Sequence, residues 1–200
     1  MPFPRHLNAP LLALVLLCAA LAAPVPRALA QAQPDHPDAD AARAEKLYRA
    51  GDMKGAAKSF RAALKRRKDD TALWVALAYA LIHRGELGDA RKALETALRL
   101  DPNRATAHAG LAFMHLLAGR VVRAAESARR AVEIEPRNID ARYVLGRVYL
   151  AEGAWLKALA EADSIIKLDA RTANAYLLRA EAMMGLYERA NALLSDERRG

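Results

Sequence analysis

The sequence predicts an all-α fold in which antiparallel helix pairs stack along one axis, because small residues and prolines recur at a fixed spacing. Four glycines lie 34 residues apart, at Gly51, Gly85, Gly119 and Gly153. Alanines follow them by five residues, at Ala56, Ala90, Ala124 and Ala158. Small residues also precede them by seven, at Ala44, Ala78, Ala112 and Gly146, and the prolines Pro102 and Pro136 keep the same step. Such a period is the sequence signature of a solenoid.

Each 34-residue unit predicts a helix, a tight turn at its glycine and a second helix. Glycine allows the reversal because it has no Cβ, and the alanines on both sides of the turn let two helices approach closely. The amphipathic run from Arg91 to Leu100 ends shortly before Pro102, where a proline would stop a helix. A single pair cannot bury its apolar stripe alone, so we expect the pairs to stack.

The unit from Thr71 to Arg104 carries Trp74, Leu77, Ala78, Leu81, Ala90, Leu94, Ala97 and Pro102. These residues resemble the tetratricopeptide repeat pattern W-x2-L-G-x2-Y, A-x3-F, P. The resemblance implies a right-handed superhelical solenoid over residues 39–200, with repeats at about 37–70, 71–104, 105–138 and 139–172 and a shortened fifth unit at 173–200. In the fifth unit we expect a first helix, a turn at Gly185 and a short second helix from Tyr187 to Arg199.

The first 30 residues have the layout of a bacterial secretory signal peptide. Arg5 precedes an apolar run from Pro10 to Ala23, and Ala28-Leu29-Ala30 is a small-x-small cleavage site. Cleavage after Ala30 would leave residues 31–38 as a disordered leader and would place the protein in the periplasm or outside the cell. A retained anchor is less favoured because the run is shorter than the roughly 20 residues that a spanning helix needs. Lipidation at Cys18, the sole cysteine, stays open.

Composition and motifs give no support for an enzyme, a metal site or a cofactor. One cysteine excludes disulfide frameworks and Cys-based zinc sites. His108 and His115 lie seven residues apart on one predicted helix, about 10 Å along its axis, which is too far to share an ion, so we expect them in the core. No G-x-S-x-G elbow and no glycine-rich phosphate loop occurs. We therefore predict no catalytic residue, no metal ligand and no cofactor-binding residue.

A second apolar face on the first helices predicts where a partner could bind. Side chains advance by about 100° per residue around a helix, so this second apolar face lies roughly opposite the face that carries the core positions. In tetratricopeptide arrays such positions line a concave groove, which implies a peptide-binding site here. The predicted groove residues are Val75, Tyr79, Ile82, Phe113, Leu116, Tyr143, Arg147, Leu150 and Leu177. If Tyr79, Phe113 and Tyr143 face solvent, polar substitutions there should barely alter folding; the alternative is that this face packs between repeats.

The second helices carry most of the basic surplus of a chain with formal net charge +8. The predicted function is a non-enzymatic scaffold of the bacterial envelope that binds a protein or peptide in the concave groove. The alternative is an adaptor whose basic convex face holds an anionic glycan or lipid, and an ordinary solvated face is the plainer reading of these charges. Nucleic acid is not expected as a partner, because stacking aromatic residues are absent from the basic face of the second helices.

Overall fold

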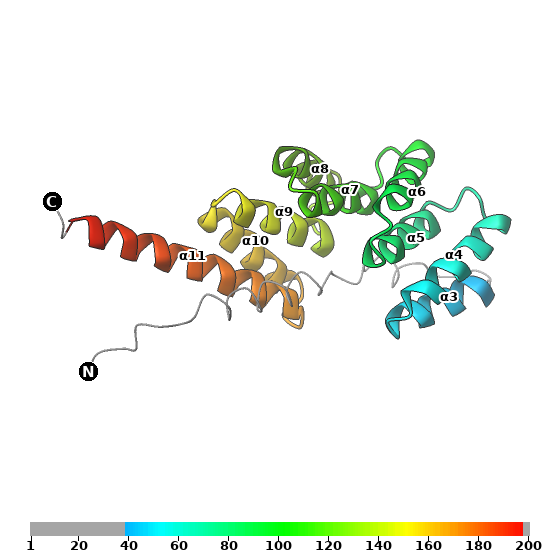
Figure 1. Ribbon diagram of the computed structural model, residues 1–200, viewed down its shortest axis with the longest axis horizontal. Coiled ribbons are helices and arrows are strands. Elements are labelled where there is room, and N and C mark those ends of the chain that lie inside the picture. Colours follow the sequence, from blue (N-terminus) through cyan, green and yellow to red (C-terminus); the bar gives the residue numbers. More distant parts are fainter. Residues whose placement is uncertain (1–38, 198–200) are drawn as a thin grey trace.

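The structure is a computed structural model that describes residues 39–197, and these residues form nine α-helices and no strand. The helices are α3 (Ala39–Arg49), α4 (Met53–Arg66), α5 (Thr71–His83), α6 (Leu87–Leu100), α7 (Ala105–Leu117), α8 (Val121–Ile134), α9 (Ile139–Ala151), α10 (Trp155–Leu168) and α11 (Ala173–Glu197). Successive antiparallel pairs follow one another from α3 and α4 at one end to α11 at the other (Figure 1). The predicted all-α solenoid of helix pairs is confirmed. The predicted signal peptide and leader lie outside the described residues.

A left-handed glycine closes the turn inside each of the four helix pairs. Gly51, Gly85, Gly119 and Gly153 have φ angles of 82°, 76°, 68° and 69°, whereas no other described residue has a positive φ. The amide after Gly85, that of Glu86, donates to the carbonyl of Leu81 at 2.9 Å, and the amide of Gly85 itself donates to Ile82 at 2.9 Å. These two hydrogen bonds satisfy the carbonyls of Leu81 and Ile82 in the last turn of the first helix.

Small residues occupy the places where paired helices approach each other. The alanines that follow each turn are fully buried, as are those that precede it in the first three repeats: Ala56, Ala90, Ala124 and Ala158, and Ala44, Ala78 and Ala112. Gly146 has the same place in α9, where an added Cβ would lie 3.4 Å from Cβ of Glu161 on the paired α10 and 2.4 Å from a methyl carbon of Leu178 on α11. The core therefore consists of close backbone contacts as much as of large side chains.

An equivalent hydrogen bond anchors the loop before each of four first helices, and a different type of side chain makes it in each repeat. Trp74 Nε1 donates to the carbonyl of Lys68 at 2.7 Å, and Arg142 Nε donates to Pro136 at 2.6 Å. In the other two repeats the side chain likewise bonds the carbonyl of the residue six positions earlier. His108 Nε2 bonds Pro102 at 3.0 Å, and Tyr176 Oη donates to Ala170 at 3.0 Å. His108 is only half-buried, so the expectation that it lies in the core is wrong: its ring serves as a loop anchor.

The C-terminal unit differs from the prediction. Residues Ala173–Glu197 form one continuous helix of 25 residues, without a turn at Gly185. The position 34 residues after Gly153 holds Tyr187, and a tyrosine in the left-handed region costs about 1–2 kcal/mol, so the helix continues. Gly185 instead lies against Trp155, where a Cβ would meet ring atoms at 2.6 Å. Its role is close packing, and the distal part of α11 projects beyond α9 and α10 (Figure 1).

Candidate functional site

The nine residues predicted to line a groove do not share one environment. Four of them are buried: Val75, Tyr79, Ile82 and Tyr143. The other five are partly exposed: Phe113, Leu116, Arg147, Leu150 and Leu177. The expectation that Tyr79 and Tyr143 face solvent is therefore wrong, because their exposed fractions are only 1% and 3%.

Packing between repeats explains the buried tyrosines. Tyr79 on α5 belongs to the same apolar cluster as Tyr48 on α3. Tyr143 on α9 packs in a second cluster with Ile165 of α10 and Leu178 of α11. Each ring thus joins one helix pair to the next, as stacked repeats require. A binding role stays a prediction for the partly exposed residues of the predicted groove.

Two first helices each carry a buried tyrosine whose hydroxyl group makes no hydrogen bond. The hydroxyls of Tyr48 and Tyr79 are buried and have no hydrogen-bond partner among the described residues. Burial raises the pKa of both phenols, and the nearby charge of Asp140 adds to this shift. The Tyr48 ring meets the His83 ring edge-on at a centroid distance of 5.8 Å, and burial lowers the pKa of His83. An unpaired buried hydroxyl costs about 1–3 kcal/mol, so these groups reduce stability.

Arg147, the one charged residue of the predicted groove, is held by an ion pair between repeats. Its Nη1 donates to both carboxylate oxygens of Glu181, at 3.0 and 3.3 Å. The two residues occupy equivalent positions in consecutive repeats, on α9 and α11. A ligand carboxylate would have to compete with Glu181 for this guanidinium.

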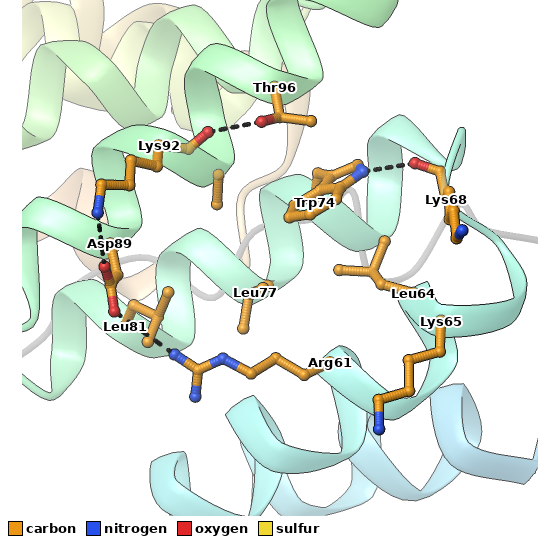
Figure 2. A pocket seen from close by; sticks show the side chains of 11 residues that line it. Arg61, Leu64, Lys65, Lys68, Trp74, Leu77, Leu81, Asp89, Lys92 and Thr96 are labelled. Atoms are coloured by element: carbon orange, nitrogen blue, oxygen red, sulfur yellow. Dashed lines mark hydrogen bonds and ion pairs between the residues drawn. The ribbon is translucent and has the colours of Figure 1, made fainter.

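A cleft of about 530 Å³ opens between α4, α5 and α6 (Figure 2). Its floor is apolar and consists of Leu64, Trp74, Leu77, Leu81 and Ala93. Its rim carries four cations and one acid, with Thr96 beside them: Arg61, Lys65, Lys68, Lys92 and Asp89. The hydrogen bond from Trp74 to the Lys68 carbonyl holds the indole in the floor of the cleft and keeps Lys68 at its edge.

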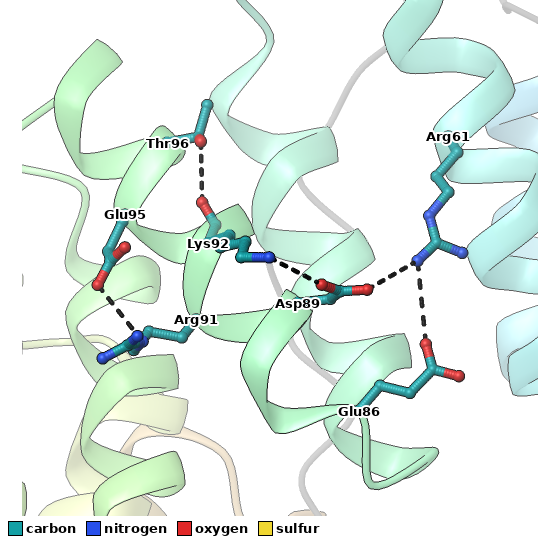
Figure 3. Close-up of polar contacts among 7 residues, drawn as sticks. All are labelled: Arg61, Glu86, Asp89, Arg91, Lys92, Glu95 and Thr96. Carbon is teal, nitrogen blue, oxygen red and sulfur yellow. Dashed lines mark hydrogen bonds and ion pairs between the residues drawn. The ribbon is translucent and has the colours of Figure 1, made fainter.

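Some cations of the rim form ion pairs with acids, whereas others do not (Figure 3). Asp89 lies 3.8 Å from Arg61 and 3.5 Å from Lys92, and Arg61 also lies 3.9 Å from Glu86. Lys65 and Lys68 form no ion pair with any other residue in the range 39–197. All of these side chains are solvent-accessible, so each pair contributes about 0–1 kcal/mol and could exchange for a ligand carboxylate.

Elsewhere the basic second helices carry their own acids. The pairs along α6 and α8 are Arg91 with Glu95 at 3.7 Å, Arg130 with Glu133 at 3.6 Å, and Arg129 with Glu152 at 3.8 Å, just after α9. Such interleaving is typical of a solvated surface. The cleft is therefore the part of the predicted basic face that combines unpaired cations with a hollow.

Sequence reasoning identified the cations of the rim but not the cleft. The basic surplus of the second helices and of the loops that follow them includes Arg61, Lys65, Lys68 and Lys92, and Trp74 is one of the repeat positions. The signal that could have joined them is the indole itself, because the equivalent positions in the next two repeats hold His108 and Arg142, which are smaller or polar.

Neither a metal cluster nor a membrane-spanning helix is found among the described residues. Across residues 39–197, no three His, Cys, Asp or Glu side chains converge to hold a metal ion. No helix in that range combines the length and the apolarity that a membrane crossing needs. His115 is partly exposed rather than buried as expected, and its partial burial together with nearby arginines lowers its pKa.

The stacked helix pairs define the class of the protein, an α-helical repeat solenoid. A family model described as "Tetratricopeptide repeat" matches residues 47–112 and 115–182, and a second model with this description matches residues 19–71. The first covers more than half of the chain, and the protein therefore belongs to the tetratricopeptide repeat family. No curated protein matches the chain in sequence.

Several solved structures share the fold. A thermophilic TPR protein of Thermus thermophilus, TTC0263, is similar with 20% identity and a TM-score of 0.65, over 86% of this chain and 97% of that one. The MamA protein is similar with 23% identity and a TM-score of 0.55, over 80% and 87%. The first TPR of Spaghetti (RPAP3), bound to the HSP90 peptide SRMEEVD, has 13% identity and a TM-score of 0.53, over 58% and 93%. At these identities the likeness shows the fold alone.

Proposed function

We propose that this protein is an exported scaffold of the bacterial cell envelope that binds acidic segments of other proteins and catalyses no reaction. The observation that carries the proposal is the cleft between α4, α5 and α6, with an apolar floor under a cationic rim. Membership of the tetratricopeptide repeat family supports a non-catalytic interaction role, because its members are generally scaffolds.

The charge of the rim and the apolar floor of the cleft indicate which kind of ligand would fit. Four cations against one acid leave a net positive rim, which attracts carboxylates. The floor of Leu64, Leu77 and Leu81 offers a place for one apolar side chain of the ligand. A protein segment with acidic residues around an apolar anchor matches both features. An anionic glycan or lipid headgroup, the alternative, would use the rim and leave the apolar floor without a partner.

A related fold supports binding of such a segment. The neighbouring structure of the first TPR of Spaghetti (RPAP3) holds the peptide SRMEEVD, which combines acidic and apolar residues. The likeness to the present chain is one of fold, so it supports the kind of ligand and not its position.

The face of the first helices is a second candidate for peptide binding. Phe113, Leu116, Leu150 and Leu177 remain partly exposed there, on α7, α9 and α11. Clustered exposed apolar groups mark interaction sites. This surface would bind an apolar segment, with little dependence on salt.

Selection from a random peptide library displayed on phage tests the proposal and separates the two candidates. We expect peptides with acidic residues around one apolar residue, whose binding weakens steeply as salt rises. The double variant Lys65→Glu/Lys68→Glu should lose them, while the control Lys54→Glu/Lys58→Glu, with the same charge change on exposed positions of α4, should retain them. Apolar peptides that are lost in Phe113→Ser/Leu116→Ser instead would establish the second candidate.

Export needs its own test, because residues 1–30 lie outside the described part. The layout of Arg5, the apolar run and Ala28-Leu29-Ala30 supports it, although one family model extends over residues 19–71 and so overlaps the end of the predicted signal. Intact-mass analysis of the protein from bacterial fractions should show a periplasmic chain that begins at Gln31. A full-length cytoplasmic chain would contradict export, and a lipidated mass beginning at Cys18 would show an anchored lipoprotein.

A further inference from the structure

The last helix exposes a surface that every other first helix buries. In α5, α7 and α9 the side toward the second helix of the same pair is covered, and Ala78, Ala112 and Gly146 are buried there. In α11 the equivalent Ala180 is exposed, and so is Met183, at 54%. The cause is the missing turn at Tyr187, so that within residues 39–197 no second helix folds back on α11.

The exposed side of α11 carries a regular apolar stripe. It consists of Tyr176, Ala180, Met183, Tyr187, Ala190 and Leu194, all exposed. Their spacing alternates between four and three residues, the pattern of a coiled-coil seam. At 1.5 Å per residue the stripe is about 27 Å long, and the opposite side of the helix packs on α10 through Ala175, Leu178 and Ala182. The stripe therefore has the form of a surface for another helix.

The stripe is complementary to itself in the antiparallel direction. When two such helices cross at the midpoint of the stripe, level with residue 185 along the axis, Tyr176 of each copy faces Leu194 of the other. In the same alignment Ala180 faces Ala190, which permits close approach, and Met183 faces Tyr187. No charged residue lies within the stripe. Arg179 borders it and is paired with Asp163 of α10 at 3.2 Å, and Glu188 and Arg189 point away from it at 100° per residue.

The distal half of α11 needs such a partner. It projects beyond α9 and α10 in Figure 1, and its large apolar residues Tyr187, Leu193 and Leu194 are 67%, 59% and 51% exposed. A helical segment of about 12 residues is only marginally stable in water without packing. In the antiparallel pair, the distal half of one copy covers the proximal half of the other, where a second helix lies in every other repeat.

We infer that two copies of this chain associate through α11 as an antiparallel, two-fold symmetric helix pair. The interface is isologous, because the same stripe serves both subunits. It is small by the standards of permanent dimers, so the dissociation constant is expected in the micromolar range. The interface lies at the opposite end of the array from the cleft, and the inference does not depend on the proposed function.

Sedimentation equilibrium of the full chain, at concentrations up to about 0.5 mM, tests the association. We expect a shift from one to two times the 21.8 kDa monomer mass. Tyr187→Glu should raise the dissociation constant by more than about tenfold, because it buries a charge in the stripe. The matched control Val122→Glu alters a residue of α8 that is 73% exposed and should not change it. Circular dichroism should show native helix content for both variants.

Disulfide cross-linking tests the orientation, in a Cys18→Ser background that leaves only introduced thiols. An equimolar mixture of Ala180→Cys and Ala190→Cys chains should cross-link as a heterodimer. Ala180→Cys alone should not, because in the antiparallel pair its two thiols lie about 15 Å apart along the axis, well beyond disulfide reach. A chain that is monomeric throughout, an association unaffected by Tyr187→Glu, or efficient cross-linking of Ala180→Cys with itself would each overturn the inference.

Discussion

The helices α5 and α11 are both first helices of their repeats, yet they differ in what covers them. In α5 nine of 13 residues are buried, between its own second helix and the neighbouring pairs. In α11 Tyr176, Met183, Met184, Tyr187, Leu193 and Leu194 are all exposed. Composition accounts for part of the contrast, because α11 carries six charged residues and α5 carries none, but it does not explain why large apolar side chains of α11 stay exposed. The difference shows that the burial of a position in this fold depends on the next helix along the chain.

The largest expected effect contrasts one tyrosine from each helix. Tyr79→Ser should lower the free energy of unfolding by about 3–5 kcal/mol, because it truncates a buried aromatic ring. Tyr187→Ser should change it by about 0.5 kcal/mol or less, because that ring is 67% exposed. Urea unfolding at low protein concentration, where α11 is unpaired, measures both. Equal costs for the two substitutions would contradict the burial described for Tyr79.

Overpacking provides the next contrast. Ala90→Leu and Ala124→Leu should each cost about 1–3 kcal/mol, because these alanines lie fully buried where paired helices meet. Ala190→Leu on α11 should cost about 0.5 kcal/mol or less at low protein concentration, as should the surface substitution Lys92→Ala. The comparison would fail if Ala190→Leu destabilised the monomer as much as Ala90→Leu does.

A smaller effect concerns the unpaired hydroxyl of Tyr79. Tyr79→Phe keeps the ring and removes the buried oxygen, so we expect the free energy of unfolding to rise by about 1 kcal/mol. Tyr187→Phe, on the exposed part of α11, should leave it unchanged. A loss of stability in Tyr79→Phe, measured by the same urea unfolding, would mean that the hydroxyl has a partner in solution.

The smallest effect is a pH dependence from α5, since α11 contains no histidine. Burial lowers the pKa of His83, so between that value and its ordinary value of about 6.5 the unfolded chain binds a proton that the folded chain does not. Stability from this group is present above about pH 6.5 and is lost as the pH falls. Unfolding curves at several pH values should show a weaker acid loss in His83→Gln than in the parent. An identical pH profile would contradict the role of His83.

The sequence predicted the repeats well because the turns depend on single residues. Gly51, Gly85, Gly119 and Gly153 each need a left-handed backbone, and this requirement is visible in a bare sequence. Gly185 was misread as a fifth turn because it lies near the expected place. Its reason for being glycine is contact with Trp155, which is a tertiary feature.

The surfaces were harder to predict than the fold. The spacing of Tyr79 and Tyr143 indicates a second apolar face, but it does not show whether solvent or the next repeat covers that face. The cleft likewise depends on how α4, α5 and α6 pack around Trp74, which no local sequence pattern records. Residues that form turns were therefore predicted, whereas residues whose role depends on neighbouring repeats were not.

The left-handed glycine also decides where a helix pair closes. Each such glycine turns the chain back and starts a second helix, which closes one unit and offers a face to the next. Where Tyr187 stands in its place, α11 continues without a turn and keeps one side uncovered within the described residues. The regular succession of turns is thus interrupted by the backbone preference of one residue, and a Tyr187→Gly change would favour a turn there rather than alter the chemistry of the surface.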